Sequence, residues 1–537
     1  MIASKFVKTS FTRLAASTRQ SFSKPTSRRG LVALTTLTAV AIPSGFVYFR
    51  PSISLDSQAH PVKMTPETTH PETRVLSRSE VSDHKSPSDG GLWVIIDNAV
   101  YDVSNFLDQH PGGSGIIESN AGKDVTKLFK PIHPPNTIGT HLGQGVEKVG
   151  DCEPMGEEEA KSLMTDEEKR ISEARSKLGH VDTVVNLDDF ERVCKDILSK
   201  KALAYYSSGS DDEGTIRSNV SSFSRILFKP RVLRKVKDVS IETTILGHPS
   251  SSPIYISPAA LARLGNEDGE MNLTKGAAQT GIIQVISSNA SCSLDEMCDV
   301  RKENQPLFWQ YYVNANRDLA YKALQNALDH KMNSIWVTVD APVGGKREAD
   351  LRVQLEENPP TNESSGKGGS TSEQMFSFVD PNLSWEDLKW MKERAPDVSF
   401  VIKGIGSVED AVMAIEAGMN GIVISNHGGR QLNGGIPPIR ILERLTTQHA
   451  DLLAKHKTEI FLDGGIRRGT DVLKALCLGA TAVGLGRTFL YAQSAWGTEG
   501  VVKAVEVMND EIKLGMRLLG VTSLTELGPE YIEVLPM

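Results

Sequence analysis

Cysteine is scarce in this chain, which has only five such residues among 537. No two of them are spaced as Cys-x-x-Cys, so the sequence predicts unpaired thiols. Such thiols neither require nor exclude an oxidising compartment. The five residues are Cys152, Cys194, Cys292, Cys298 and Cys477.

Acidic residues are missing from the first 55 positions, which carry eight lysines and arginines. Because the whole chain has a formal net charge of −8, removing those eight charges leaves −16 on residues 56–537. An acidic body argues against nucleic acid and favours a basic partner, or solubility alone. The hydrophobic content of 39% is that of a soluble globular protein, and the length allows two or three domains.

Residues 1–50 resemble a two-part targeting signal. The first 29 residues are rich in Arg, Lys, Ser and Thr, which is typical of a mitochondrial presequence. Residues 30–49 are mostly apolar and match the roughly 20 residues that cross a bilayer. Matrix targeting followed by a cleaved stop-transfer segment predicts the mitochondrial intermembrane space; the alternative is a retained inner-membrane anchor. Residues 51–75 are rich in Ser, Thr, Pro and His, which predicts a disordered linker.

The next region, residues 76–151, offers two histidines as candidate metal ligands. Short strands are predicted at Trp93–Ile96 and Val100–Val103, and helical stretches follow up to Ala121 and Phe129. Two neutral imidazoles on opposing loops can hold an iron from both faces, although a lone His beside Pro-Gly is usually a turn residue. The two candidates are His110, in His-Pro-Gly-Gly, and His133.

These motifs together with Ala121-Gly122-Lys123-Asp124-Val125-Thr126 resemble the cytochrome b5 family. The resemblance implies a small α+β domain that holds one haem b between His110 and His133. With both axial positions filled, it further implies electron transfer and not oxygen activation.

The rest of the chain has the pattern of a barrel. Residues 152–186 are charged and predict a hinge or a solvated helix. In residues 187–537, apolar runs alternate eight times with amphipathic helical stretches, which predicts an α/β protein with a (β/α)8 TIM barrel. The runs are Ile254–Ser257, Ile283–Ser287, Phe308–Val313, Ile335–Asp340, Phe400–Lys403, Ile422–Ser425, Ile460–Asp463 and Ala482–Leu485.

Six of the eight runs end in residues that carry chemistry. The carboxyl ends of barrel strands meet at one face, where active sites lie. A single buried Lys or Asp there could belong to a structural ion pair, but six such ends favour a site. The residues are Ser287, Gln310 with Tyr312, Thr338 with Asp340, Lys403, Ser425 with His427, and Asp463.

Two loops add more specific signals. Residues 425–431 place His427 and Arg430 three positions apart around two glycines, which suits acid–base work on an anion; the alternative is an ordinary turn. Asp463–Gly469 and Gly484–Arg487 combine glycines with arginines after strands seven and eight, where barrels often bind phosphate.

From about Leu187 to Leu527 the chain resembles the FMN-dependent α-hydroxy acid dehydrogenase/oxidase family. The resemblance is carried by Gln310–Asn314, Thr338–Pro342, Ile402–Gly404, Ser425–Leu432 and Asp463–Gly465.

The resemblance implies a role for each matching residue. His427 is the active-site base, and Asp340 orients its imidazole. Tyr312 binds the substrate hydroxyl, and Arg430 binds the carboxylate together with Tyr205. Core packing is the alternative for Tyr205.

Further roles concern the second cation and the cofactor. Arg347 lies near the substrate carboxylate, and Lys403 stabilises charge on the reduced flavin. The flavin ring contacts Ser287, Gln310 and Thr338. The residues matched to the phosphate end and its turns are Asp463, Gly464, Gly465, Arg467, Gly486 and Arg487.

The two domains in tandem resemble the flavocytochrome b2 family. This implies oxidation of an L-2-hydroxy acid, foremost L-lactate to pyruvate, with single electrons passing from FMN through haem b to cytochrome c, and a homotetramer. An oxidase that uses oxygen or another acceptor is the alternative. A haem-binding electron carrier on an inactive barrel is disfavoured, because the site residues are present.

Three departures from the family pattern leave undetermined which side chain the substrate carries. They are Asn289, Pro258-Ala259-Ala260 and Asn433. Residues 352–380 have little apolar character, which predicts a long mobile loop after strand four. We interpret it as a tolerated insertion, because its composition offers no closing contacts; the alternative is a loop that covers the active site.

Overall fold

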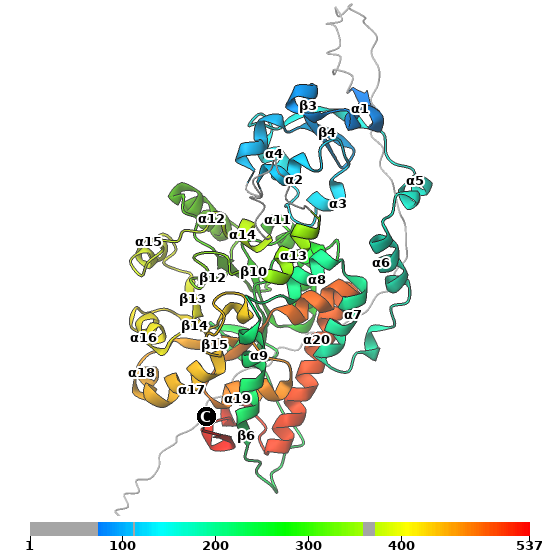
Figure 1. Ribbon diagram of the computed structural model, residues 1–537. Coiled ribbons are helices and arrows are strands. Elements are labelled where there is room, and N and C mark those ends of the chain that lie inside the picture. The colour runs from blue at the N-terminus through cyan, green and yellow to red at the C-terminus, as the bar shows by residue number, and fades with distance from the viewer. Residues whose placement is uncertain (1–73, 111–112, 358–370, 537) are drawn as a thin grey trace, which may run out of the picture. The chain divides into compact units, whose positions relative to one another are not determined.

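The computed structural model describes residues 74–110, 113–357 and 371–536 (Figure 1). The predicted targeting signal and nearly all of the predicted linker lie outside these residues. None of the described helices is both long and apolar enough to cross a membrane. The five cysteines are all described and all unpaired, as predicted.

The first folded unit is a five-stranded sheet with short helices. Its strand order is β1-β5-β4-β3-β2. Asp97 and Asn98 join β3 to β4 with φ angles of 50° and 61°, as in the tight turns that match strand twist. The strands are β1 (Val75–Leu76), β2 (Lys85–Ser86), β3 (Gly91–Ile96), β4 (Ala99–Asp102) and β5 (Glu147–Cys152). The helices are α1 (Arg78–Ser82), α2 (Ser114–Glu118), α3 (Thr126–Phe129) and α4 (Thr137–His141).

The two strands predicted for this unit are confirmed as the hairpin of β3 and β4. The side chains of β3 contribute to two small hydrophobic cores. Successive side chains of a strand point to opposite faces. Leu92, Val94 and Ile96 therefore pack in one apolar cluster, while Trp93 and Ile95 pack in another.

The charged stretch predicted as a hinge contains two helices, α5 (Glu157–Ser162) and α6 (Asp166–Ser176). Thr165 and Glu168 form a capping box that starts α6. The Arg175 guanidinium donates hydrogen bonds to the carbonyl oxygens of Gly265 (2.7 Å) and Ser494 (3.1 Å). The second helix is thus attached to the barrel unit.

The predicted eight-stranded barrel is confirmed. Eight parallel strands close in the order β10-β11-β12-β13-β14-β15-β16-β9, and helices surround them (Figure 1). Their residues are almost all buried, because helices cover the outside and side chains fill the inside. The strands are β9 (Ile254–Ile256), β10 (Ile283–Ser287), β11 (Leu307–Tyr311), β12 (Ser334–Thr338), β13 (Ser399–Ile405), β14 (Gly421–Ile424), β15 (Glu459–Asp463) and β16 (Ala482–Leu485).

Aromatic side chains fill the barrel interior. The Trp336 ring stacks on Phe461 with centroids 5.2 Å apart and meets Tyr255 edge-on, also at 5.2 Å. At the amino-terminal end of the barrel, the hairpin of β7 (Thr243–Ile245) and β8 (His248–Ser250) adds Ile245 to this cluster. The barrel is therefore a packed core, which leaves its carboxyl-terminal end for a site.

Helices connect the strands and cover the barrel. Before β9 come α7 (Leu187–Ile197), α8 (Lys200–Ser207), α9 (Gly214–Ser221) and the short strand β6 (Ile226–Phe228), which pairs with β17 (Ile532–Val534). After β9 come α10 (Glu270–Thr280), α11 (Leu294–Asp299), α12 (Arg317–Asp329), α13 (Glu348–Glu357), α14 (Thr371–Phe376), α15 (Asp387–Arg394), α16 (Val408–Glu416), α17 (Pro438–Gln448), α18 (Ala450–Lys455), α19 (Gly469–Cys477) and α20 (Arg487–Leu519).

The prediction of a long loop at residues 352–380 is wrong for the part of that segment that the structure describes. Its two ends belong to α13 and α14, and residues 358–370 lie outside the description. Phe376 and Val379 are buried with Tyr312 and Ala341 in one cluster. Two apolar residues in a polar segment are thus enough to attach it to the barrel.

Candidate active site and haem site

A cavity opens at the carboxyl ends of the barrel strands. It holds about 1180 Å³ of space free of atoms, including open solvent at its mouth, which is ample for a cofactor and a small substrate. Most residues predicted for the site line it: Tyr205, Ser287, Tyr312, Arg347, Lys403, His427, Arg430, Asp463, Gly464, Gly465, Arg467, Gly486 and Arg487.

A hydrogen-bonded pair forms one wall of the cavity. His427 Nδ1 donates to Asp340 Oδ1 over 2.9 Å, which leaves the lone pair on Nε2. The Tyr312 hydroxyl lies 3.4 Å from that Nε2. The arrangement can therefore accept a proton at Nε2 beside a hydroxyl group.

The surroundings keep this imidazole neutral. Burial lowers the pKa of His427, and the charges of Lys403 and Arg347 lower it further against the opposing effect of Asp340. Burial raises the pKa of Asp340, but His427 and Lys403 outweigh that effect and the net pKa is lowered. An ionised carboxylate thus holds a neutral base.

The loop after β14 holds His427 in an unusual backbone conformation. Its φ is 57°, a region that few residues with a side chain adopt. Asn426 and Asn219 exchange two amide hydrogen bonds of 2.8 Å, and the Asn426 side chain also accepts from the Gly429 N–H at 3.1 Å. The Gln431 amide donates to the Asp340 carbonyl oxygen at 2.9 Å. These bonds fix the histidine loop against the loop of Asp340.

Two guanidinium groups face the same part of the cavity. The carbons at their centres lie 5.0 Å (Arg430) and 5.8 Å (Arg347) from the centre of the Tyr205 ring. Neither forms an ion pair with any described carboxylate, and Nε of each is buried without a hydrogen bond. Burial and the neighbouring Arg430 lower the pKa of Arg347 to about 9. Such a pair is suited to binding a carboxylate.

The predicted flavin contacts form a row across neighbouring strands. Ser287 Oγ donates to Gln310 Oε1 (3.1 Å), and Gln310 Nε2 donates to Thr338 Oγ1 (2.9 Å). Ser287 lines the cavity, while Gln310 and Thr338 do not. On the other side, Lys403 Nζ lies 3.6 Å from Asp463 Oδ2. Burial lowers the pKa of Lys403, but Asp463 and Asp340 reverse the effect, so the ammonium stays charged.

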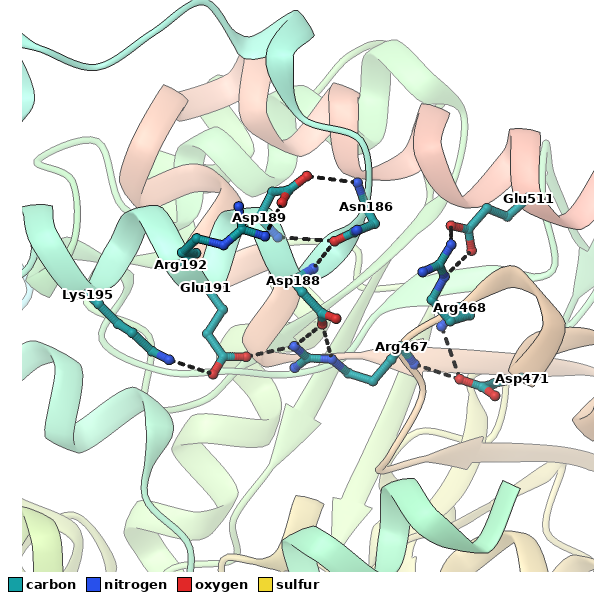
Figure 2. Close-up of polar contacts among 10 residues, drawn as sticks. All are labelled: Asn186, Asp188, Asp189, Glu191, Arg192, Lys195, Arg467, Arg468, Asp471 and Glu511. Carbon is teal, nitrogen blue, oxygen red and sulfur yellow. Dashed lines mark hydrogen bonds and ion pairs between the residues drawn. The ribbon is translucent and has the colours of Figure 1, made fainter. Parts of the chain in front are cut away.

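The two arginines predicted for a phosphate have different partners. Arg487 is partly buried and donates to the carbonyl oxygens of Tyr206 (3.2 Å) and Gly428 (2.9 Å), without an ion pair among the described residues. Arg467 instead forms ion pairs with Asp188 and Glu191 of α7 (Figure 2). This pairing was not predictable from the sequence, because the partners lie far apart along the chain.

Some residues of the cavity wall were not predicted from the sequence. Met375 and Phe376 line the cavity: the Tyr205 hydroxyl lies 3.9 Å from Met375 Sδ, and Phe376 packs edge-on against Tyr312. No pattern in their polar segment indicated this role. Ser257 also lines the cavity, and its place at a strand end could have indicated it.

The residues that depart from the family pattern separate into two groups. Asn289 and residues 258–260 line the cavity, and the Asn289 amide donates to the Met375 carbonyl oxygen at 3.3 Å. Asn433 is not part of the wall; its side chain accepts from the Thr215 N–H at 3.0 Å.

The cavity fits FMN by the chemistry of its wall. Ser257 Oγ and Asp463 Oδ1 are buried without hydrogen-bond partners, so a ligand with polar ring edges can satisfy both. Gly464 and Gly465, with φ angles of 89° and 86°, expose backbone close to Arg487, as phosphate-binding turns do.

The two predicted haem ligands face each other in the first unit. The imidazole centroids of His110 and His133 are 6.1 Å apart, which matches the span of about 6 Å expected for rings on two metal–nitrogen bonds of about 2 Å. Nδ1 of each donates to a carbonyl oxygen, of Gly113 (2.9 Å) and Phe129 (3.1 Å). Each Nε2 is therefore free to bind iron. Burial lowers the pKa of His133 to about 4, which keeps it in the neutral form that binds metals.

Comparison with known proteins identifies a family for each of the two units. Residues 194–534 match the FMN-dependent dehydrogenase family, and residues 77–175 match the cytochrome b5-like heme/steroid binding domain. L-lactate dehydrogenase (cytochrome) of Wickerhamomyces anomalus is 41% identical over 94% of this chain and 86% of its own length. The protein of that name from Saccharomyces cerevisiae is 41% identical over 86% of this chain and 80% of its own length.

A solved structure gives the same result. The flavin-binding domain of baker's yeast flavocytochrome b2 is 41% identical and superimposes with a TM-score of 0.64, covering 69% of this chain and 92% of that one. The chain therefore belongs to the FMN-dependent dehydrogenase family and carries a cytochrome b5-like domain in front of its barrel. It is an oxidoreductase with FMN and haem as cofactors.

The haem geometry generates a prediction. Replacing His133 with Ala removes one axial imidazole, so we expect the absorption spectrum of six-coordinate, low-spin haem to be lost. His141→Gln is the control, because this imidazole packs 4.7 Å from the Phe106 ring but is not one of the facing pair. Full low-spin haem in the His133→Ala variant, measured by absorption spectroscopy, would contradict the assignment.

Proposed function

We propose that this protein oxidises L-lactate to pyruvate and passes the electrons through FMN and haem b to cytochrome c. The observation that carries the proposal is the cavity itself. A neutral imidazole with an ionised partner faces two guanidinium groups that have no counter-ion among the described residues. The relatives named L-lactate dehydrogenase (cytochrome) support the choice of substrate and of acceptor.

The substrate is held at its carboxylate. Arg347 and Arg430 bind the carboxylate oxygens, and both guanidinium groups pack against the Tyr205 ring. Binding of the anion offsets the cost of two buried cations with like charge, so it favours 2-hydroxy acids over neutral alcohols.

The reaction breaks the O–H and C–H bonds of the substrate and forms a C=O bond. His427 Nε2 accepts the hydroxyl proton while Tyr312 hydrogen-bonds to the same oxygen. Asp340 stabilises the imidazolium that results. When bound, FMN supplies an acceptor for the hydrogen of the C–H bond with its electron pair, and haem supplies a carrier that passes the electrons onward one at a time.

The remaining assignments concern the cofactors. Ser287, with Gln310 and Thr338 behind it, orders the flavin side of the cavity, and Lys403 places a positive charge there. His110 and His133 hold the haem. The phosphate end is made by Gly464, Gly465, Arg467, Gly486 and Arg487, while Asp463 pairs with Lys403 on the flavin side.

We base the proposed electron acceptor on the charge of the chain, and the proposed location on its predicted targeting signal. The acidic body, with −16 on residues 56–537, attracts a basic cytochrome c by electrostatic steering. The leader sequence supports the mitochondrial intermembrane space, with an inner-membrane anchor if residues 30–49 are retained. A homotetramer is proposed by analogy with the family.

A second candidate function is a 2-hydroxy-acid oxidase that does not need the haem domain. A peroxisomal (S)-2-hydroxyacid oxidase of Arabidopsis thaliana favours it, being 36% identical over 66% of this chain and 97% of its own length.

Stopped-flow spectroscopy separates the two functions. When L-lactate is mixed anaerobically with the loaded protein, we expect the flavin to bleach first and the haem to become reduced in the same experiment. Flavin that bleaches while haem stays oxidised would favour the oxidase. A flavin that L-lactate does not bleach would refute the proposed substrate. His427→Asn is expected to slow flavin reduction by about 10²–10⁴-fold, because the proton acceptor is lost.

The pKa shifts predict the pH dependence. The pKa of His427 lies below its usual 6.5, so its base form persists at neutral pH and flavin reduction slows only on acidification below that pKa. Asp340→Asn removes a charge that raises the pKa of His427, so the acid limb should move to lower pH while the plateau rate falls. A limb that moves to higher pH in Asp340→Asn, measured by stopped-flow rates from pH 4.5 to 8, would refute the electrostatic account.

A further inference from the structure

Arg467 belongs to a charged network at the start of α7 (Figure 2). Its Nε donates to Asp188 Oδ1 over 2.8 Å, and a terminal nitrogen contacts the same oxygen. That nitrogen also donates to Glu191 Oε2 over 2.7 Å. Two carboxylates thus share one guanidinium, while Lys195 lies 3.9 Å from Glu191.

Because of this pairing, the two arginines of the phosphate end differ in how far nearby carboxylates offset their charge. Arg487 is partly buried and donates to two carbonyl oxygens, and it forms no ion pair within the described residues. Arg467 lines the same cavity, but its charge is offset by two carboxylates. A phosphate that binds there has to share Arg467 with Asp188 and Glu191.

The Asp188 carboxylate is not needed to start α7. Asn186 caps the helix by accepting from the N–H groups of Asp188 (2.9 Å) and Asp189 (3.3 Å). Asp189 completes the capping box by accepting from the Asn186 N–H at 3.1 Å, and it pairs with Arg192. The side chain of Asp188, which is 53% exposed, is thus free to act on Arg467 alone.

We propose that Asp188 competes with the phosphate of FMN for Arg467 and thereby weakens retention of the cofactor. The proposal rests on the phosphate assignment of Arg467 and Arg487 made above, and it does not depend on which substrate is oxidised. Asp188 acts through Arg467 and is a positioning residue.

The expected effect is moderate. A half-exposed carboxylate that pairs with a cation of the phosphate end would oppose a phosphate there by Coulomb repulsion and by occupying the guanidinium. Asp188→Asn keeps the shape and removes the charge. We expect it to lower the Kd for FMN by about three- to tenfold.

Flavin fluorescence gives a readout that does not need activity. The flavin-free, haem-loaded protein is titrated with FMN and, separately, with riboflavin, which has no phosphate. In Asp188→Asn the affinity for FMN should rise while that for riboflavin stays the same. Asp196→Asn is the matched control: it removes the same charge from the same helix about two turns further on, where the side chain is exposed and far from Arg467.

A second pair of variants tests whether Asp188 acts through Arg467. In an Arg467→Met background, Asp188→Asn should lose most of its effect on the Kd for FMN. Unchanged or weaker FMN binding in Asp188→Asn overturns the proposal, and so does equal tightening by Asp196→Asn. If the wild-type protein binds FMN no better than riboflavin, the phosphate assignment itself fails, which is a different result. Asp188→Ser replaces Asp188→Asn if that variant does not fold.

Discussion

Three guanidinium groups lie at the carboxyl end of the barrel and form no ion pair with a described carboxylate: Arg347, which is buried, and Arg430 and Arg487, which are partly buried. Withdrawing a cation from water costs several kcal/mol unless an anion compensates it. Burial and mutual repulsion lower the pKa of Arg347 to about 9 and of Arg487 to about 10. The closed barrel imposes this arrangement, because its eight strand ends converge on one cavity. We therefore propose that anions complete the cavity, a carboxylate at one end and a phosphate at the other.

The carboxylates of the site are placed so that they do not cancel this charge. The Asp340 carboxylate hydrogen-bonds to His427, and Asp463 lies 3.6 Å from Lys403. The base remains neutral because burial, which is the largest effect, and the charges of Lys403 and Arg347 together outweigh Asp340. Arg467, like Lys403, has carboxylate partners, but its partners belong to α7. The first unit adds a separate device, two facing imidazoles whose outer nitrogens are held by carbonyl oxygens.

Much of the fold and of the site was predictable, because polar residues at the ends of apolar runs mark where barrel strands end. Each apolar run became a strand, and a residue such as Lys403 or Asp463 marked the end that faces the cavity. Met375 and Phe376 could not be predicted, because the few apolar residues of their segment show neither a helical nor a strand period. The pairing of Arg467 with Asp188 was equally hidden, since 279 positions separate them and only the fold brings α7 to that loop.

The most direct test of the central claim compares a 2-hydroxy acid with its neutral amide. L-lactate and L-lactamide have almost the same shape, but only the acid supplies the negative charge that the buried guanidinium groups require. Anaerobic flavin reduction, followed by stopped-flow absorbance, should be roughly 10²–10³-fold less efficient with the amide in kcat/KM terms. Equal efficiency for the two compounds would contradict the claim that uncompensated buried cations define this site.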